Sequence, residues 1–328
     1  MKRLTRSAVL ALCAAIAATA AFAAPQSAKK KAPPPRRAVV AKKPPAAPAD
    51  TPFRKTPFVG AISANAATGE ILFSENADQV AYPASVTKLM TALLVLEDVK
   101  ARRYSLDTLV EVSPEIAYSE ASWMGLKAGQ RVRVDHLLMA MLVNSANDAA
   151  IALAAHANGS HAAFVERMNA RAQMLGMAKT KYFNANGLPP NAGRRYPWKE
   201  YNRTTAADQL KLAREILKNH SEILKYTSIK VRNAAETPLV DGAGKPYPLK
   251  NHNHNLVLDK FKVVNPDGTE AVDGLKTGYI DAGGSSIVLT GTRRGKRAIV
   301  VVLGAQSAEL RDTNAARLLS EALGTLAW

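Results

Sequence analysis

The stretch AYPASVTKLMTALLVLE, Ala81–Glu97, places a serine and a lysine three residues apart at the start of an apolar helical pattern. Residues three apart on a helix lie on one face, so the side chains of Ser85 and Lys88 can touch. A serine hydroxyl is a poor nucleophile until a neighbouring base takes its proton. Lysine can be that base only when neutral, which requires burial or a second positive charge nearby. The stretch therefore predicts an activated serine and a second cation close to Lys88.

A second element, LLMAMLVNSANDAAIALA (137–154), sets Ser145, Ala146 and Asn147 in the middle of an apolar helical pattern. Small polar side chains disrupt helices because they bond to the backbone. A helix junction capped by Asn147 or Asp148 also explains this pattern, so the element alone leaves a structural and a functional interpretation open.

A third element, DGLKTGYIDAGG (273–284), places Lys276, Thr277 and Gly278 in a strand pattern. The glycines Gly274 and Gly278 weaken a strand unless another backbone must approach it closely. A solvated strand end is the alternative interpretation of an isolated Lys-Thr-Gly sequence.

The first 23 of the 328 residues have a basic start, a short apolar run and a small-residue exit at Ala21, Phe22 and Ala23. This pattern predicts a secretory signal peptide cut after Ala23. Its apolar run is shorter than the roughly 20 residues that a membrane span needs, and no later segment supplies one. We therefore expect an exported protein without a transmembrane anchor, which is periplasmic, or wall-associated or secreted where no outer membrane exists.

The single cysteine, Cys13, lies inside the predicted signal peptide, so the mature chain is expected to have no disulfide or thiol chemistry. The net charge of +17 suggests a nucleic-acid partner, but its distribution does not. Residues 1–23 carry +3 and residues 24–57 carry +8, which leaves +6 for the rest of the chain. We therefore expect no nucleic-acid partner.

Residues 24–56 are mostly Ala, Pro, Lys and Arg, as in KKKAPPPRRAVVAKKPPAAP. Proline keeps the backbone extended and the apolar content is too low to fold, so this segment is predicted to be a disordered basic spacer. It is either a solubilising tether or a segment attracted to an anionic envelope polymer.

The remaining residues, 57–328, are predicted to form one domain. FVGAISANAATGEILFSEN (58–76) has a hairpin pattern with Gly69 in its turn. Helical patterns follow at 85–99, 136–155 and 161–175, and strand patterns return in AVDGLKTGY, SSIVLTGTRR and AIVVVLGA before a final amphipathic helix. Strands at both ends with helices between them predict one antiparallel sheet with an inserted helical subdomain.

Together, the three elements resemble the penicillin-binding protein and serine β-lactamase superfamily, whose Ser-x-x-Lys, Ser-x-Asn and Lys-Thr-Gly elements occur in this order. The closer resemblance is to the low-molecular-mass penicillin-binding proteins, the D-alanyl-D-alanine carboxypeptidases of the S11 peptidase family. It covers residues 58–328 and rests on YPASVTKLMTALLVLE, NSANDAAIALAAHANGS, FVERMNARAQMLGM, YFNANGLP, DGLKTGYIDAGGSS and VVLGAQSAELRDTNAARLL. The resemblance implies an α/β (α+β) fold: a β-lactamase-like antiparallel sheet flanked by helices.

The resemblance also implies an acyl-transfer reaction. Ser85 is expected to attack the carbonyl between the last two D-alanines of a peptidoglycan stem peptide, and to hold the remainder as an ester until water hydrolyses it. Lys88 is the expected base. Lys276 is expected to lower the pKa of Lys88 and, through Ser145, to pass a proton to the departing amine.

Binding roles follow from the same resemblance. Asn147 is expected to hydrogen-bond the substrate's side-chain amide, and the backbone N–H groups of Ser85 and Tyr279 to hold the oxyanion. Thr277 is expected to bind the substrate's terminal carboxylate together with Lys276.

Arg311 matches an arginine that the family places near the carboxylate pocket, although it could instead be a surface residue at a helix start. The substrate is expected to lie beside the strand of Gly278 as an added strand, which would explain the glycines on both sides of Lys276.

The leading function is thus a serine-type D-Ala-D-Ala carboxypeptidase, with a D,D-endopeptidase as the alternative. A β-lactamase is disfavoured because the second motif is Ser-Ala-Asn and no deacylating glutamate can be assigned. A non-catalytic wall-binding protein is disfavoured because it needs none of the catalytic side chains. Expected partners are peptidoglycan stem peptides and β-lactam antibiotics, and no cofactor is expected.

The chain departs from the family pattern in two places. It stops at Trp328, soon after the last amphipathic helix, as in shorter members that cut cross-links, whereas larger members continue into a second domain and a membrane anchor. The family's Asn-x-Asn segment reads NHNHN here (251–255). His252 and His254 share a face if this segment is a strand, but no third ligand of matching spacing is evident, so no metal site is expected.

Overall fold

The computed structural model describes residues 57–327 except 115, 117–121, 191–198 and 231–252. The chain divides into two compact units, Met1–Lys43 and Pro44–Trp328, and every described residue lies in the second. The predicted signal peptide (1–23) and the spacer (24–56) lie outside the described residues.

An antiparallel sheet forms the centre of the described unit, with the strand order β2-β1-β7-β6-β5. The N-terminal hairpin therefore pairs with the last strand of the chain, as the sequence pattern predicts. Gly69 has a φ of 81° in the hairpin turn, a conformation that glycine adopts without steric cost. The strands are β1 (Gly60–Asn65), β2 (Ile71–Glu75), β5 (Val272–Ile280), β6 (Gly284–Arg293) and β7 (Lys296–Ala305).

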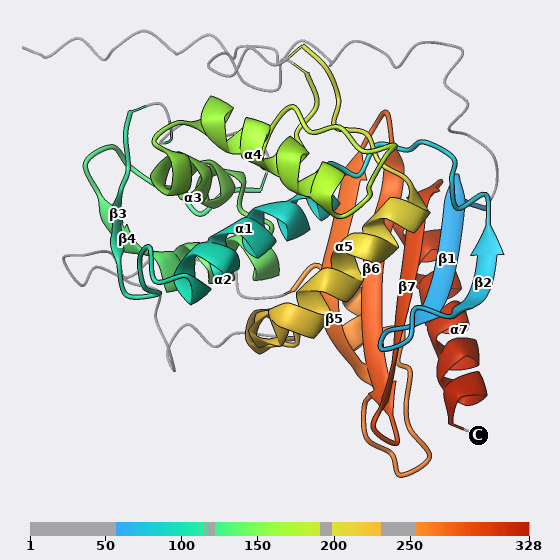
Figure 1. Ribbon diagram of the computed structural model, residues 1–328. Helices are drawn as coiled ribbons and strands as arrows, with labels where there is room; N and C mark the ends of the chain where they lie inside the picture. The colour runs from blue at the N-terminus through green and yellow to red at the C-terminus, as the bar shows by residue number, and fades with distance from the viewer. Residues whose placement is uncertain (1–56, 115, 117–121, 191–198, 231–252, 328) are drawn as a thin grey trace, which may run out of the picture. The chain divides into compact units, whose positions relative to one another are not determined.

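Helices cover both faces of this sheet (Figure 1). Helix α5 (Ala206–Asn219) packs on β1, β6 and β7 from one side, and α7 (Ala308–Leu326) packs on the same strands from the other. Each begins at a capping side chain, Thr205 for α5 and Ser307 for α7, which accepts a backbone N–H three residues later. The residues predicted for the apolar face of α7 are buried: Ala315, Leu318, Leu319, Ala322 and Leu323.

The helical subdomain is inserted between β2 and β5 and lies beside the sheet (Figure 1). Its central helix α1 contacts α2, α3, α4 and α5 and is buried on nearly all sides. The elements are η1 (Ala84–Thr87), α1 (Lys88–Lys100), β3 (Leu109–Glu111), β4 (Arg131–Arg133), α2 (Val134–Val143), α3 (Asn147–Asn158) and α4 (His161–Met174), followed after α5 by η2 (Ser221–Ile223), α6 (Leu224–Thr227) and η3 (Leu256–Leu258).

The single helix predicted over 136–155 is wrong, because two helices occupy this range. Helix α2 ends at Val143 and α3 begins at Asn147. Between them Ser145 has a φ of 60°, in the left-handed region, and Ala146 is extended, with a ψ of 121°. A helix cannot continue through these conformations. The helix junction that the sequence left open is therefore present, but its N-cap residue is Ala146, which makes no side-chain capping hydrogen bond, and not Asn147 or Asp148.

The predicted antiparallel sheet flanked by helices, with its helical insertion, is confirmed. Helices α5 and α6 were not predicted. The pair β3–β4 was not predicted either, because each of these strands has only three residues. No helix in the described part of the chain is long and apolar enough to cross a membrane.

Candidate active site

The serine and lysine of the opening stretch are in contact. Ser85 lies in the short 3₁₀ turn η1 and is partly exposed, whereas Lys88 is the first residue of α1 and is completely buried. Nζ of Lys88 is 2.8 Å from Oγ of Ser85. Ala84, just before the serine, has a φ of 48°, an unfavourable conformation for a residue with a Cβ. Strain of this kind gathers at functional sites.

Two further contacts hold the amine of Lys88. Its Nζ donates to Oδ1 of Asn147 at 2.7 Å and to the backbone oxygen of Asn186 at 2.7 Å. These partners come from distant parts of the chain: Asn147 begins α3, and Asn186 lies in the segment between α4 and α5. The fold therefore surrounds the buried amine with three oxygen atoms.

Burial and the positive charge of Lys276 lower the pKa of Lys88 well below its usual value, and the carboxylate of Asp148 acts in the opposite direction. Burial is the larger cause because it penalises the charged form of an amine that water cannot reach. The environment thus favours the neutral amine, the form that can accept a proton.

Lys276 lies on β5 and is 2% exposed. Its Nζ donates to the backbone oxygen of Thr277 at 3.0 Å. Burial, followed by the positive charge of Arg311, lowers the pKa of Lys276 to about 7. Arg311 is itself buried at the start of α7, where Nε and Nη2 donate to the carboxylate of Asp312 at 2.7 and 2.9 Å. The structure therefore places Arg311 near Lys276, not on the open surface.

The junction between α2 and α3 carries the second motif. Ser145 is buried in its left-handed conformation, two residues before Asn147. The backbone N–H of Asn147 donates to Ser122 O at 2.8 Å. The neighbouring Asp148 accepts from the backbone N–H groups of the loop after Ser122, those of Met124, Gly125 and Leu126. Asp148 thus fastens this loop to the start of α3.

Glycines allow close approach of two backbone segments to the serine turn. A Cβ on Gly278 of β5 would lie 2.6 Å from Pro83 O and 3.0 Å from Ser85 N. A Cβ on Gly187 would overlap Ala84 O. The prediction that Gly278 marks a close backbone approach is correct, and the approaching backbone is that of the turn that carries Ser85.

A glycine is needed at position 274 for a different reason. A Cβ there would lie 2.5 Å from Oγ1 of Thr227, a side chain of α6. The predicted explanation of both glycines by an added substrate strand is therefore unnecessary. Strand β5 still forms the end of the sheet among the described residues.

The other residues predicted on β5 differ in exposure. Thr277 is 5% exposed, whereas Tyr279 is 61% exposed and its hydroxyl donates to Oδ1 of Asp281 at 2.8 Å. Residues two apart on a strand share a face, so the ring of Tyr279 stands beside Thr277.

Asparagines hold the segment that supplies the Asn186 oxygen. The side chain of Asn202 donates to Oγ1 of Thr87 at 2.9 Å and accepts from the backbone of Phe183 and Asn184. Asn184 in turn accepts from Gly187 N at 2.6 Å. This network joins the segment to the turn that carries the serine.

Two hydrogen bonds at Ala185 complete the attachment. Its backbone oxygen accepts from Oγ1 of Thr91 at 2.7 Å, and its N–H donates to Nε2 of His161 at 3.1 Å. The stretch YFNANGLP contributes to the family resemblance, yet its pattern alone does not predict a contact with Lys88. Its run of asparagines before a glycine was the available signal.

Within the described ranges no group of three or more His, Cys, Asp or Glu side chains is placed to hold a metal. Of the two alternating histidines, His254 is exposed and His252 lies outside the described residues.

The chain is 30% identical over 256 residues to the D-alanyl-D-alanine carboxypeptidase DacF of Bacillus subtilis, which covers 77% of this chain and 58% of that protein. The chain thus spans somewhat less than three fifths of this relative's length. Over 126 residues it is 41% identical to a D-alanyl-D-alanine endopeptidase of Pseudomonas aeruginosa, covering 37% of this chain and 38% of the relative.

A solved structure has the same fold. It is penicillin-binding protein D2 of Listeria monocytogenes in its ampicillin-bound form, with a TM-score of 0.64 at 31% identity, covering 80% of this chain and 96% of that one. The fold predicted from the resemblance is therefore confirmed. A family model for peptidase S11, described as D-alanyl-D-alanine carboxypeptidase, matches residues 58–307. The chain belongs to the S11 peptidase family.

Proposed function

We propose that this protein is a serine-type D-Ala-D-Ala carboxypeptidase that removes the last D-alanine from peptidoglycan stem peptides through an acyl-enzyme on Ser85. The observation that carries the proposal is the environment of Lys88, a buried amine with three oxygen neighbours and a lowered pKa. A buried lysine in contact with a partly exposed serine fits the activation of a nucleophile.

The contacts of Lys88 suggest which way the proton moves. A neutral amine has two hydrogens and one lone pair. The oxygens of Asn147 and Asn186 can only accept, so they take the two hydrogens, and the lone pair is left for the hydroxyl of Ser85. Lys88 is therefore the general base for Ser85.

Acylation then proceeds in two stages. Oγ of Ser85 forms a bond to the carbonyl carbon between the last two D-alanines, and its proton passes to Lys88. The tetrahedral intermediate collapses when the carbon–nitrogen bond breaks, and the proton that Lys88 accepted passes through the hydroxyl of Ser145 to the leaving amine, which leaves Lys88 neutral again. Free D-alanine departs, and the rest of the peptide remains as an ester on the serine.

Hydrolysis repeats these steps with water as the nucleophile. Lys88 accepts a proton from the water, the ester bond to Ser85 breaks, and Oγ recovers its proton. The products are the shortened stem peptide with a free carboxylate and the unmodified enzyme. No cofactor takes part in this sequence.

The remaining predicted residues bind substrate in this proposal. Lys276 and Thr277 receive the terminal carboxylate, with Arg311 adding positive charge behind Lys276. The side chain of Asn147 orients the stem-peptide amide. The backbone N–H groups of Ser85 and Tyr279 stabilise the oxyanion, and loss of one such donor typically lowers the rate by about 10² to 10³. The close packing of Gly278 on the serine turn brings these two backbone segments together.

The proposal is tested by incubating the mature protein with purified stem pentapeptide and measuring free D-alanine by mass spectrometry. We expect one D-alanine per peptide, with none from Ser85→Ala. A folded wild-type protein that releases no D-alanine from the pentapeptide contradicts the proposal.

A D,D-endopeptidase is the second candidate, and the 41% identity to an endopeptidase over 126 residues favours it. The same machinery would cleave a cross-link whose leaving group is a second stem peptide. Cross-linked muropeptide dimers separate the two activities, since an endopeptidase releases monomers without free D-alanine.

We also propose that the protein acts outside the cytoplasm, because residues 1–23 have a signal-peptide pattern and the proposed substrate is a cell-wall polymer. Mass determination of the N-terminus after expression tests the predicted cut after Ala23. An uncut N-terminus on the exported protein contradicts it.

A further inference from the structure

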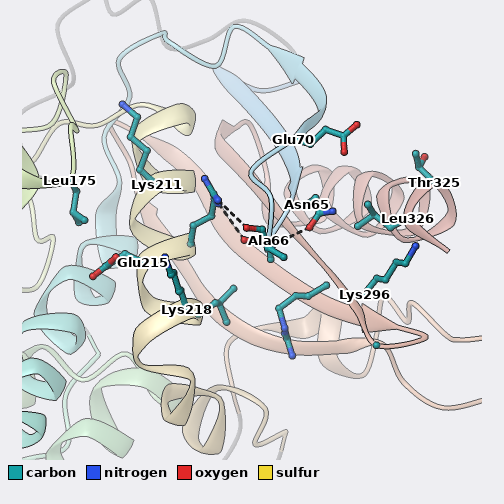
Figure 2. Close-up of a pocket in the computed structure, with 15 residues that line it drawn as sticks. Asn65, Ala66, Glu70, Leu175, Lys211, Glu215, Lys218, Lys296, Thr325 and Leu326 are labelled. Carbon is teal, nitrogen blue, oxygen red and sulfur yellow. Dashed lines mark hydrogen bonds between the residues drawn. The ribbon is translucent and has the colours of Figure 1, made fainter. Parts of the chain in front are cut away.

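A large groove lies away from the catalytic residues. It has a volume of about 1000 Å³ and is formed by the β1–β2 turn, α5, the β6–β7 turn and the end of α7. Figure 2 shows Lys211, Glu215 and Lys218 along α5, with Lys296 and Thr325 across from them. None of the residues assigned above to the catalytic or binding machinery lines this groove.

The wall of the groove is held by Arg214 of α5. Its guanidinium donates to the backbone oxygens of Ala66 and Ala67 at 3.3 and 3.2 Å, and it fills the space beside Gly69, where a Cβ would overlap it. The hairpin turn is therefore attached to α5, which positions one wall of the groove.

Positive charge dominates the lining. Two of its cations are neutralised by acids, Lys211 by Asp208 and Arg297 by Asp273. One of its acids, Glu215, is bound by Arg171.

Three cations, those of Arg214, Lys218 and Lys296, then face one remaining acid, Glu70. Lys218 and Lys296 are exposed and form no ion pair within the described part of the chain. Like charges gathered in a concave surface focus the potential and raise the local concentration of anions.

We propose that this groove is a second binding site for the substrate polymer, which holds the carboxylates of neighbouring peptidoglycan stem peptides while another stem occupies the active site. The inference rests on the proposed function, because the substrate proposed there is a polymer that carries many stem peptides on one strand. A second contact on the same molecule raises the effective concentration of substrate without altering the chemistry.

The mixture of charges favours this polymer over a uniformly anionic one. Glu70 would repel a chain of phosphates, but it can accept from the amine that a stem peptide carries beside its carboxylates. Lysines on long flexible side chains suit carboxylates whose spacing varies, because an ammonium needs no fixed orientation of its partner.

The test compares two charge reversals in the full mature chain, each made in Ser85→Ala so that the polymer stays intact. The first variant combines Lys218→Glu with Lys296→Glu. The control combines Lys127→Glu with Arg131→Glu, which makes the same change in net charge at two exposed residues outside the groove. Co-sedimentation with purified sacculi stripped of phosphate polymers measures binding.

We expect the groove variant to bind sacculi about tenfold more weakly at low salt, the lower end of what focused charge achieves. The control should bind like its parent, and the difference should vanish near 1 M salt, where the screening length is roughly 3 Å. Equal losses in the two variants, or no loss in either, overturn the inference. Binding only to sacculi that retain phosphate polymers overturns the assignment to stem carboxylates.

Two measurements keep the outcomes separate. With Ser85 restored, the groove variant should release D-alanine from soluble pentapeptide at the wild-type rate, because the active site is unaltered. If the wild type itself releases none, the proposed function fails, while the binding comparison still decides the groove. If thermal unfolding shows that the glutamate variant is not folded, the variant Lys218→Gln with Lys296→Gln replaces it. Unchanged sacculus binding by this second variant overturns the inference.

Discussion

The backbone oxygen of Asn186 lies 2.7 Å from Nζ of Lys88, although 98 positions separate the two residues in the chain. A backbone carbonyl cannot donate or rotate away, so it fixes the direction of one N–H of the amine. The amine's remaining lone pair can then face Ser85 only if the segment around Asn186 stays in place. The rigidity of a loop far along the chain thus becomes part of the site.

Loosening that segment should slow acylation. Asn202→Ala removes the link to Thr87 and leaves the backbone N–H groups of Phe183 and Asn184 without their acceptor. We expect a loss of stability of about 1–3 kcal/mol, the cost of unsatisfied buried groups. Displacement of the Asn186 oxygen should also lower the acylation rate by about 10- to 100-fold. Denaturant unfolding and labelled-penicillin acylation measure the two effects.

Asn169→Ala is the matched control for this experiment. Asn169 hydrogen-bonds to both backbone groups of Tyr182, at the start of the same segment, and none of its hydrogen bonds in the described part of the chain reaches the serine turn. It should lose stability while acylating at nearly the wild-type rate. Equal slowing of acylation in both variants would mean that the position of the Lys88 amine depends on the general stability of the segment and not on the hydrogen bond to Thr87.

The contact between Gly187 and the serine turn should tolerate no side chain. Gly187→Ala places a methyl group against Ala84 O in a backbone with a φ of 84°. We expect a loss of more than about 3 kcal/mol, since overpacking adds to the conformational cost. Gly176 also has a positive φ, of 67°, but an added Cβ there would meet open space. Gly176→Ala should therefore lower the free energy of unfolding by only about 1–2 kcal/mol. Thermal unfolding of both variants measures the difference, and similar melting temperatures would contradict the close approach.

Penicillins should acylate Ser85, since their strained amide and carboxylate mimic the D-Ala-D-Ala end. Labelled penicillin should mark the wild type and Ser228→Ala, which removes an exposed hydroxyl that donates to Leu224 O. Ser85→Ala should remain unmarked in gels and by mass spectrometry. Labelling of Ser85→Ala at the wild-type level would place the nucleophile elsewhere.

The predictable part of this molecule is the part with strong local periodicity. The hairpin, the three long strands β5, β6 and β7, and the amphipathic α7 follow from alternation and helical spacing. The contact between Ser85 and Lys88 follows from helical geometry, although a 3₁₀ turn carries the serine.

Long-range backbone contacts could not be predicted in this way. The left-handed conformation of Ser145 could not be predicted because tertiary contacts set the backbone there, such as that of Asn147 N with Ser122 O. The Asn186 oxygen is invisible to pattern analysis because every residue has a carbonyl. Only the fold decides which one meets the lysine.

Activity should also depend on the protonation of Lys276, whose pKa is lowered to about 7. As pH rises through this value, the free enzyme loses the cation that we propose receives the substrate carboxylate. We therefore expect kcat/KM for the pentapeptide to fall on the alkaline side from about pH 7, because kcat/KM reports the groups of the free enzyme. Asp312→Asn removes the carboxylate that balances the charge of Arg311, and should move the alkaline fall of kcat/KM to lower pH. A fall at the same pH in both proteins would contradict the effect of Arg311 on the pKa of Lys276.

The same lysine should leave a signature in stability. Its pKa is about 7 in the folded protein and near 10.5 in the unfolded chain, so between these values only the unfolded state holds the proton. Stability must therefore rise with pH across this window, by up to about 1.4 kcal/mol per pH unit for this one group.

Lys276→Met abolishes the contribution and should be more stable than the wild type below pH 7, where burial of the charge is penalised in full. Denaturant unfolding of both proteins from pH 6 to pH 10 measures the difference, which should shrink steadily above pH 7. A constant difference would mean that Lys276 keeps an ordinary pKa in the folded protein, and the second cation would then lack the burial on which its effect on Lys88 depends.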